Sequence, residues 1–78
     1  MKILAFGIAR EIFGSSETEL NLHDNATVSE LKQLLEERYA RLKAIRSYMV
    51  AVNNEYVADD KRITAQDEIA IIPPVSGG

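Results

Sequence analysis

The chain has 78 residues, no cysteine, one histidine and a formal net charge of −3 at pH 7. A chain of this length has room for one small core, and a deep enzyme pocket beside that core is not expected. The lack of cysteine excludes disulfides, thiolate zinc sites and thiol nucleophiles. Nine basic and twelve acidic residues without a basic stripe give no sign of a nucleic-acid partner.

The first apolar run, Lys2–Ile8, is rich in β-branched and aromatic residues, which predicts a strand. Both of its alternating faces are apolar, so we expect a central strand, buried on one side and at least half covered on the other. Gly14 is placed to end a turn of helix after this strand. The run is too short for a signal peptide or a membrane span, so we expect a cytoplasmic protein without a membrane partner.

The alternation in Glu17–Leu22 predicts the second arm of a hairpin, followed by a loop over His23–Ala26. Thr27 and Glu30 have the spacing of a capping box, in which each side chain satisfies a backbone N–H at a helix start. A helix of three to four turns is therefore expected from Val28 onward. Its apolar positions are Val28, Leu31, Leu34, Leu35 and Tyr39, and its solvated charges are Glu36, Glu37, Arg38 and Arg41.

Three further strands are predicted in the second half of the chain. Tyr48–Val52 is apolar, and the Asn53-Asn54 pair predicts a tight turn because asparagine tolerates positive φ. Glu55–Val57 is the short return strand of this hairpin. The last strand is Ile69–Ile72, which Pro73-Pro74 must end because proline cannot donate to a sheet ladder.

The remaining positions are expected to be structural. We expect His23 at the surface and Tyr48 and Met49 in the core. Asp59-Asp60 lacks the further oxygen ligands that calcium needs, so it is interpreted as part of a polar loop. The loops expected around the last two strands are Asp59–Arg62 and Ile63–Glu68.

This order of elements predicts an α+β fold in which one main helix packs on one face of a mixed sheet of about five strands. The last strand is expected to lie parallel to the first, which is the β-grasp arrangement. We expect a β-grasp domain over residues 1–75 and a flexible C-terminal Gly-Gly tail over residues 76–78.

The C-terminal segment has the properties of a reactive tail. Glycine has no Cβ, so Gly77-Gly78 can pass through a narrow channel in a partner, while Pro73-Pro74 stiffen the base. A terminal carboxylate is a poor electrophile, and transfer to AMP would supply a good leaving group. The alternative is that the glycine pair is an ordinary small chain end.

Residues Ile71–Gly78 resemble the end of the molybdopterin synthase small-subunit family, whose pattern is two apolar residues, Pro-Pro-Val, a small residue and Gly-Gly. The resemblance extends over the whole chain. Its other matching segments are Ala9-Arg10-Glu11 with Gly14, Thr27-Val28, Ala51-Val52-Asn53 and Asp67-Glu68.

The resemblance implies a ubiquitin-like β-grasp fold and a carrier that has no activity alone. An E1-like adenylating enzyme would use ATP with Mg to adenylate the carboxylate of Gly78, and a sulfur donor system would convert it to a thiocarboxylate. The thiocarboxylate would give its sulfur to cyclic pyranopterin monophosphate in the large synthase subunit, which holds the acid–base residues. The resemblance also implies a heterotetramer of two small and two large subunits. It implies that this chain itself binds no cofactor.

The resemblance also implies an apolar docking patch at Phe6, Tyr56 and Ile72. Relatives often carry phenylalanine at the position of Ile72 and an aliphatic residue at that of Tyr56. Core packing is the alternative for Phe6 and Ile72, and an ordinary solvated side chain is the alternative for Arg10. The residues assigned to the tail or to the partner interface are Val75, Ser76, Gly77, Phe6, Tyr56, Ile72, Pro73, Pro74 and Arg10.

Three other functions compete with this hypothesis. A thiamin-pathway sulfur carrier shares the fold and the Gly-Gly end but typically lacks Pro-Pro before the tail. A ubiquitin-like protein modifier would form isopeptide bonds through Gly78. A non-catalytic β-grasp binding module would use the sheet face alone.

Overall fold

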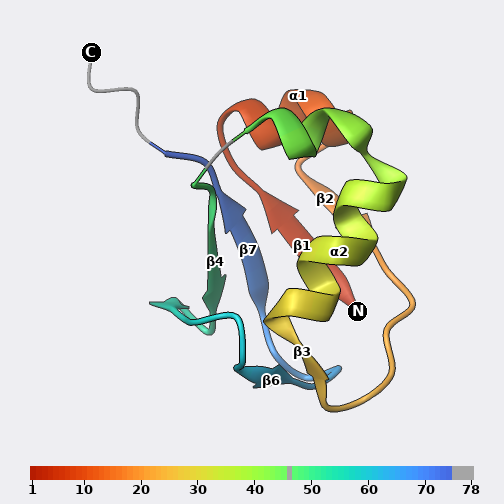
Figure 1. Cartoon of the computed structure of the whole chain (residues 1–78), viewed down its shortest axis with the longest axis vertical. Coiled ribbons are helices and arrows are strands. Elements are labelled where there is room, and N and C mark those ends of the chain that lie inside the picture. Colours follow the sequence, from red (N-terminus) through yellow and green to blue (C-terminus); the bar gives the residue numbers. More distant parts are fainter. Residues whose placement is uncertain (46, 75–78) are drawn as a thin grey trace.

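A five-stranded mixed sheet with a helix across one face forms the body of the protein (Figure 1). The computed structural model describes residues 1–45 and 47–74. The sheet has the strand order β2-β1-β7-β4-β5. Its strands are β1 (Lys2–Ala5), β2 (Glu17–Glu19), β4 (Met49–Val52), β5 (Glu55–Tyr56) and β7 (Ile69–Ile72).

The helices and a second, two-stranded sheet complete the fold. The two-stranded sheet pairs β3 with β6. These remaining elements are α1 (Ile8–Phe13), β3 (Ala26–Thr27), α2 (Val28–Arg38), the 3₁₀ helix η1 (Ala40–Ala44) and β6 (Arg62–Ile63).

Strand pairing confirms the predicted topology. The last strand, β7, lies parallel to β1, and the other three pairs of the large sheet are antiparallel. The predicted bounds of β7, Ile69–Ile72, are those of the structure. The mixed sheet with one main helix is therefore the α+β arrangement that the sequence predicted.

The core lies between the sheet and α2. Alternate residues of the three inner strands point toward the helix, because side chains of a strand alternate between its faces. Burial of each large aliphatic side chain stabilises the fold by about 1.5–3 kcal/mol. Fully or almost fully buried residues here include Ile3, Val50, Ile69 and Ile71 from the sheet and Val28, Leu31 and Leu35 from α2.

The predicted first strand is too long. β1 ends at Ala5, and Ile8, which was assigned to the strand, is instead the first residue of α1. The chain turns at Gly7, which has φ 55° and ψ −134°, while the Phe6 carbonyl accepts a hydrogen bond from the Ala9 N–H at 3.1 Å. A turn conformation reserved for glycine thus overrides the apolar pattern.

The helix ends agree better with the prediction. α1 ends at Gly14 in a left-handed conformation, as expected. At the start of α2, the Thr27 hydroxyl accepts from the Glu30 N–H at 3.2 Å, and the Glu30 carboxylate accepts from the Thr27 N–H at 3.3 Å. The predicted capping box is confirmed.

Two short strands, β3 and β6, include residues that the sequence predicted in loops. Ala26, predicted in a loop, pairs with Ile63 in the β3–β6 sheet. Each of these strands has only two residues. An alternating pattern needs about four residues to be recognised, so the sequence offered no signal for them. The Asn53-Asn54 turn is confirmed by φ values of 52° and 69°.

Two side chains depart from their predicted surroundings. Met49 is 42% exposed, so its assignment to the core is wrong, whereas Tyr48 is buried as expected. Glu36 was expected on a solvated helix face, but it is half-buried and accepts a hydrogen bond from the Tyr48 hydroxyl at 2.6 Å. Glu36 departs from the prediction because α2 lies close to Tyr48 in the fold, and Met49 does so because its position in β4 places it on the sheet face opposite α2.

Candidate functional site: the open sheet face and the C-terminal exit

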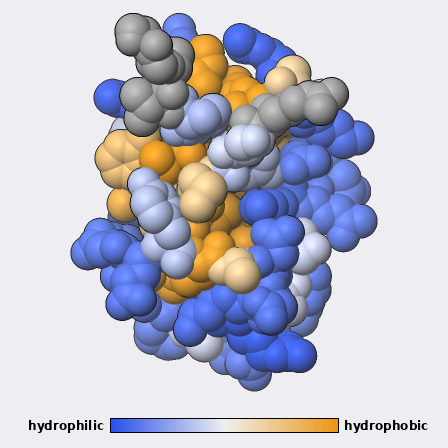
Figure 2. Space-filling view, turned by 60° about the vertical axis from the view of Figure 1, so that its left-hand side comes forward, coloured by the Kyte–Doolittle hydropathy of each residue, from blue (hydrophilic) through white to orange (hydrophobic). Residues whose placement is uncertain are grey.

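The sheet face opposite α2 is apolar and uncovered within the described residues (Figure 2). Register explains its composition: Leu4 pairs with Ala70, Ala70 with Ala51, and Ala51 with Tyr56, so these four side chains form one row across the sheet. Met49 pairs with Ile72 in the next row. We call this surface the open face, and it comprises Leu4, Phe6, Met49, Ala51, Tyr56, Ala70 and Ile72.

A hollow of about 250 Å³ lies in the open face, and it brings together the three residues of the predicted patch, Phe6, Tyr56 and Ile72. Phe6 is 49% exposed and Tyr56 62% exposed, while Ile72 is half-buried. Core packing is therefore excluded for Phe6. Asn54 and Glu68 add polar groups to the lining. Such a surface, apolar with a polar rim, is typical of a protein interaction site.

The chain leaves the sheet beside this face. We call Ile72, Pro73 and Pro74 the C-terminal exit. The Phe6 N–H donates to the Ile71 carbonyl at 3.3 Å, which places the start of the exit next to the end of β1. The ring of Pro73 lies against Gly7, and Pro74 is exposed. The predicted tail residues Val75, Ser76, Gly77 and Gly78 lie outside the described residues.

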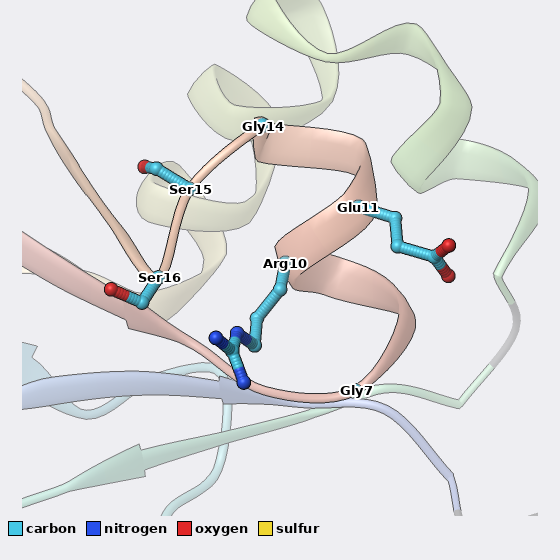
Figure 3. A pocket seen from close by; sticks show the side chains of 6 residues that line it. All are labelled: Gly7, Arg10, Glu11, Gly14, Ser15 and Ser16. Atoms are coloured by element: carbon cyan, nitrogen blue, oxygen red, sulfur yellow. The ribbon is translucent and has the colours of Figure 1, made fainter.

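Arg10 adds a positive charge at the border of the open face. It lines an open hollow of about 430 Å³ together with Gly7, Glu11 and Ser16 (Figure 3). The Arg10 side chain points back toward β1, whereas Glu11 points away (Figure 3). A neighbouring hollow shares Arg10 with Phe6, so the charge borders the open face. The structure thus groups Arg10 with the predicted apolar patch.

A hydrogen-bond network holds the far end of the open face. The side-chain amide of Asn53 donates to the Asp67 carboxylate at 3.0 Å, and its carbonyl accepts from the Glu68 N–H at 3.0 Å. Asp67 also accepts from the Thr64 N–H at 2.8 Å. The hydrogen bonds that Asp67 accepts, first that from the Thr64 N–H and then that from the Asn53 amide, hold the pKa of Asp67 below its usual value. The sequence predicted Asn53 in a turn and Asp67-Glu68 as a segment that matches the family, without a reason for their pairing.

Candidate metal ligands are not gathered anywhere in residues 1–45 and 47–74. In this part of the chain no three His, Asp or Glu side chains could hold a metal ion together. His23 lies at the surface as predicted, and its Nε2 is 2.8 Å from the Glu30 carboxylate. That hydrogen bond, followed by one with the Asp24 carbonyl, raises the pKa of His23.

No helix of the described part is both long enough and apolar enough to span a bilayer.

Comparison with known proteins agrees with this geometry. Residues 3–78 match the ThiS family. The chain belongs to the ThiS family. A molybdopterin synthase sulfur carrier subunit from Anopheles gambiae is 42% identical to it over 84 residues, which cover all of this chain and 91% of the relative. Its counterpart from Arabidopsis thaliana is 37% identical over 79 residues, or 100% of this chain and 82% of the relative.

Solved structures give the same fold. A putative molybdopterin converting factor subunit 1 from Pyrococcus furiosus aligns with a TM-score of 0.85 and 26% identity, over 95% of each chain. The small archaeal modifier protein 1 of Methanosarcina acetivorans aligns with a TM-score of 0.81 and 26% identity, over 99% of this chain and 94% of that one. The predicted ubiquitin-like β-grasp fold and the predicted family resemblance are both confirmed. The domain boundary at residue 75 stays a prediction.

Proposed function

We propose that the chain is a sulfur carrier subunit of molybdopterin synthase that acts through the carboxylate of Gly78. The observation that carries this proposal is its likeness over the whole chain to curated sulfur carrier subunits, at 37% and 42% identity. The position of the C-terminal exit supports it, because the chain leaves the sheet beside an uncovered apolar face. A partner docked on that face would receive the tail.

The proposed activation has two steps. In the active site of an E1-like adenylating enzyme, a carboxylate oxygen of Gly78 attacks the α-phosphorus of ATP and displaces pyrophosphate. Mg would accompany the ATP in that enzyme. A sulfur donor system then supplies hydrosulfide, which attacks the acyl carbon and displaces AMP. The product is a thiocarboxylate at Gly78. In this proposal ATP and Mg are used by the adenylating enzyme, and this chain binds no cofactor of its own.

The proposed transfer takes place in the large subunit of the synthase. The thiocarboxylate sulfur forms a bond to a carbon of cyclic pyranopterin monophosphate and displaces the oxygen that this carbon carried, so that the acyl group and the carbon share the sulfur as a thioester. A second charged chain supplies the second sulfur of the dithiolene in the same way. Water then hydrolyses the thioester, so the sulfur stays on the product and Gly78 regains its carboxylate. Acid–base residues for these steps belong to the large subunit, in a proposed heterotetramer of two small and two large subunits.

Each predicted site residue has a place in this scheme. The open face, with Phe6, Tyr56 and Ile72, docks the large subunit and the adenylating enzyme in turn. Arg10 supplies a cation at the border of that contact. Pro73 and Pro74 stiffen the base of the tail. Val75, Ser76 and Gly77 thread the partner's channel, where small side chains allow close backbone approach.

Reconstitution tests the proposal. The chain is incubated with adenylating enzyme, ATP, Mg and sulfide, and its intact mass should rise by the exchange of one oxygen for sulfur. Addition of the large subunit and cyclic pyranopterin monophosphate should then yield molybdopterin. Two matched variants should fail at the first step: deletion of Gly78, and addition of one alanine after Gly78. No molybdopterin from the wild-type chain would overturn the proposal.

A second candidate function is protein modification. The likeness to the small archaeal modifier protein 1 of Methanosarcina acetivorans favours it. In that case, lysine-linked adducts of the chain should accumulate in cells and disappear when Gly78 is deleted. A thiamin-pathway carrier would instead give thiocarboxylate but no molybdopterin with the large subunit. The cytoplasmic location stays a prediction.

A further inference from the structure

The turn between β1 and α1 has a geometry that favours glycine. Gly7 has φ 55° and ψ −134°, and the Ala9 N–H donates to the Phe6 carbonyl at 3.1 Å across it. These are the angles of the first central residue of a type II′ turn, which side chains of L-residues rarely tolerate. Gly7 therefore lets the chain reverse from strand to helix immediately after Phe6.

The same turn forms the seat of Pro73. A Cβ added to Gly7 would lie 3.5 Å from Cγ and 3.8 Å from Cδ of the Pro73 ring. A methyl group would meet the ring at an ordinary van der Waals distance, so Gly7→Ala would act through its positive φ, whereas a larger side chain would compete for the place of the ring. The Phe6 N–H also donates to the Ile71 carbonyl. The start of the exit is therefore held by Phe6 and Gly7, the two residues on either side of one peptide bond. Gly7 therefore lies against the first residue after β7, at the point where the chain leaves the sheet.

Gly14 at the other end of α1 provides a natural contrast. It also has a positive φ, of 80°, and it ends the helix. An added Cβ there would meet no atom within 4 Å. The two glycines therefore share a conformational demand, but Gly7 alone of the pair contacts the C-terminal exit.

We infer that Gly7 is a positioning residue for the reaction of the C-terminus: it seats Pro73 so that the tail leaves the open face in the direction a docked partner requires. The inference rests on the proposed function. Docking uses the open face and should not need Gly7, whereas entry of the tail into the partner's active site should. A misplacement of about 1 Å can cost up to about 100-fold in rate, so the effect should be visible in kcat.

Initial rates of ATP-dependent pyrophosphate release by the adenylating enzyme, measured at varied carrier concentration, test this. Gly7→Ala should lower kcat about 10- to 100-fold with KM changed by less than about twofold. Gly14→Ala is the matched control and should keep kcat within about twofold of wild type. Circular dichroism should show both variants folded. An unchanged kcat for Gly7→Ala, or an equal loss for Gly14→Ala, would overturn the inference.

Pro73→Ala keeps the test decisive if Gly7→Ala does not fold. Pro73 follows the last strand, so its replacement removes the ring without straining the turn. It should also lower kcat at unchanged KM, and the double variant should lose no more than the worse single one, because both act through one contact. A wild-type kcat for Pro73→Ala, or a loss in the double variant as large as both single losses combined, would contradict the inference. No turnover of the wild-type chain would instead refute the proposed function.

Discussion

The two faces of the large sheet have the same backbone and opposite surroundings. Ile71 and Ile72 are neighbours in β7, yet Ile71 is fully buried under α2 and Ile72 is half-exposed on the open face. The same division separates Val50 from Met49 in β4. Because side chains alternate along a strand, each strand supplies residues to both faces. The covered face therefore stabilises the fold, and the open face is the surface on which we propose that a partner docks.

The largest effect should come from the covered face. Ile71→Ala should lower the free energy of unfolding by about 2–5 kcal/mol, since it leaves a cavity in a packed core. Ile72→Ala, one residue away, should cost less than about 1 kcal/mol because its site is partly solvated. Guanidinium denaturation measures both. If Ile71→Ala does not fold, Ile71→Val should still cost about 0.5–1.5 kcal/mol. Equal losses at the two positions would break the comparison.

The open face should show the reverse pattern. Tyr56→Ala should weaken binding to the large synthase subunit at least about tenfold, because exposed aromatic side chains carry much of the energy of an interface. Its free energy of unfolding should change by less than about 1 kcal/mol. Isothermal titration calorimetry measures the binding. Lys43→Ala, an exposed residue on η1, is the control and should bind like wild type. Wild-type affinity of the Tyr56 variant would contradict the docking role.

A smaller effect is expected at the start of the helix that covers the core. Thr27→Ala removes the hydroxyl that accepts from the Glu30 N–H, so it should cost about 1 kcal/mol of stability. Thermal unfolding followed by circular dichroism measures this loss. Binding to the large subunit should not change, because Thr27 lies on the covered side. If Thr27→Ala kept wild-type stability but bound the large subunit more weakly, the two faces of the sheet would not be independent.

The smallest effect should be a pH dependence at the same helix end. The hydrogen bond between His23 and Glu30 raises the pKa of His23 from 6.5 and lowers that of Glu30 from 4.5. The His23 contribution is complete below pH 6.5 and is lost as pH rises through the folded-state pKa; the Glu30 contribution is complete above pH 4.5 and is lost on acidification. The difference in Tm between wild type and His23→Gln should therefore be greatest between pH 4.5 and 6.5. A difference independent of pH would refute the charge contact.

Periodic segments were predictable and very short ones were not. The apolar residues of Val28–Arg38 recur at helical spacing, and Ile69–Ile72 ends at a proline, so local rules are enough for both. The pairing of Ala26 with Ile63 depends on residues far apart in the sequence. Two-residue strands carry no period, so contacts across the fold decide them.

The residues of the candidate site were also only partly predictable from the sequence. Phe6, Tyr56 and Ile72 were grouped by resemblance, and the structure places them in one hollow. Met49 was assigned to the core, because its hydrophobicity does not indicate which side of β4 it occupies. Register with Ile72 places it on the open face.

By itself, the sequence determined the helix, the last strand, the Pro-Pro end and the family pattern. These follow from spacing, backbone chemistry and residue identity, which are properties of neighbours along the chain. Only the tertiary structure decided which face of the sheet stays uncovered and that Gly7 lies under Pro73. Those features depend on paired residues such as Ile3 and Ile69, which lie 66 positions apart and meet in one parallel strand pair. Packing of the whole core sets that arrangement.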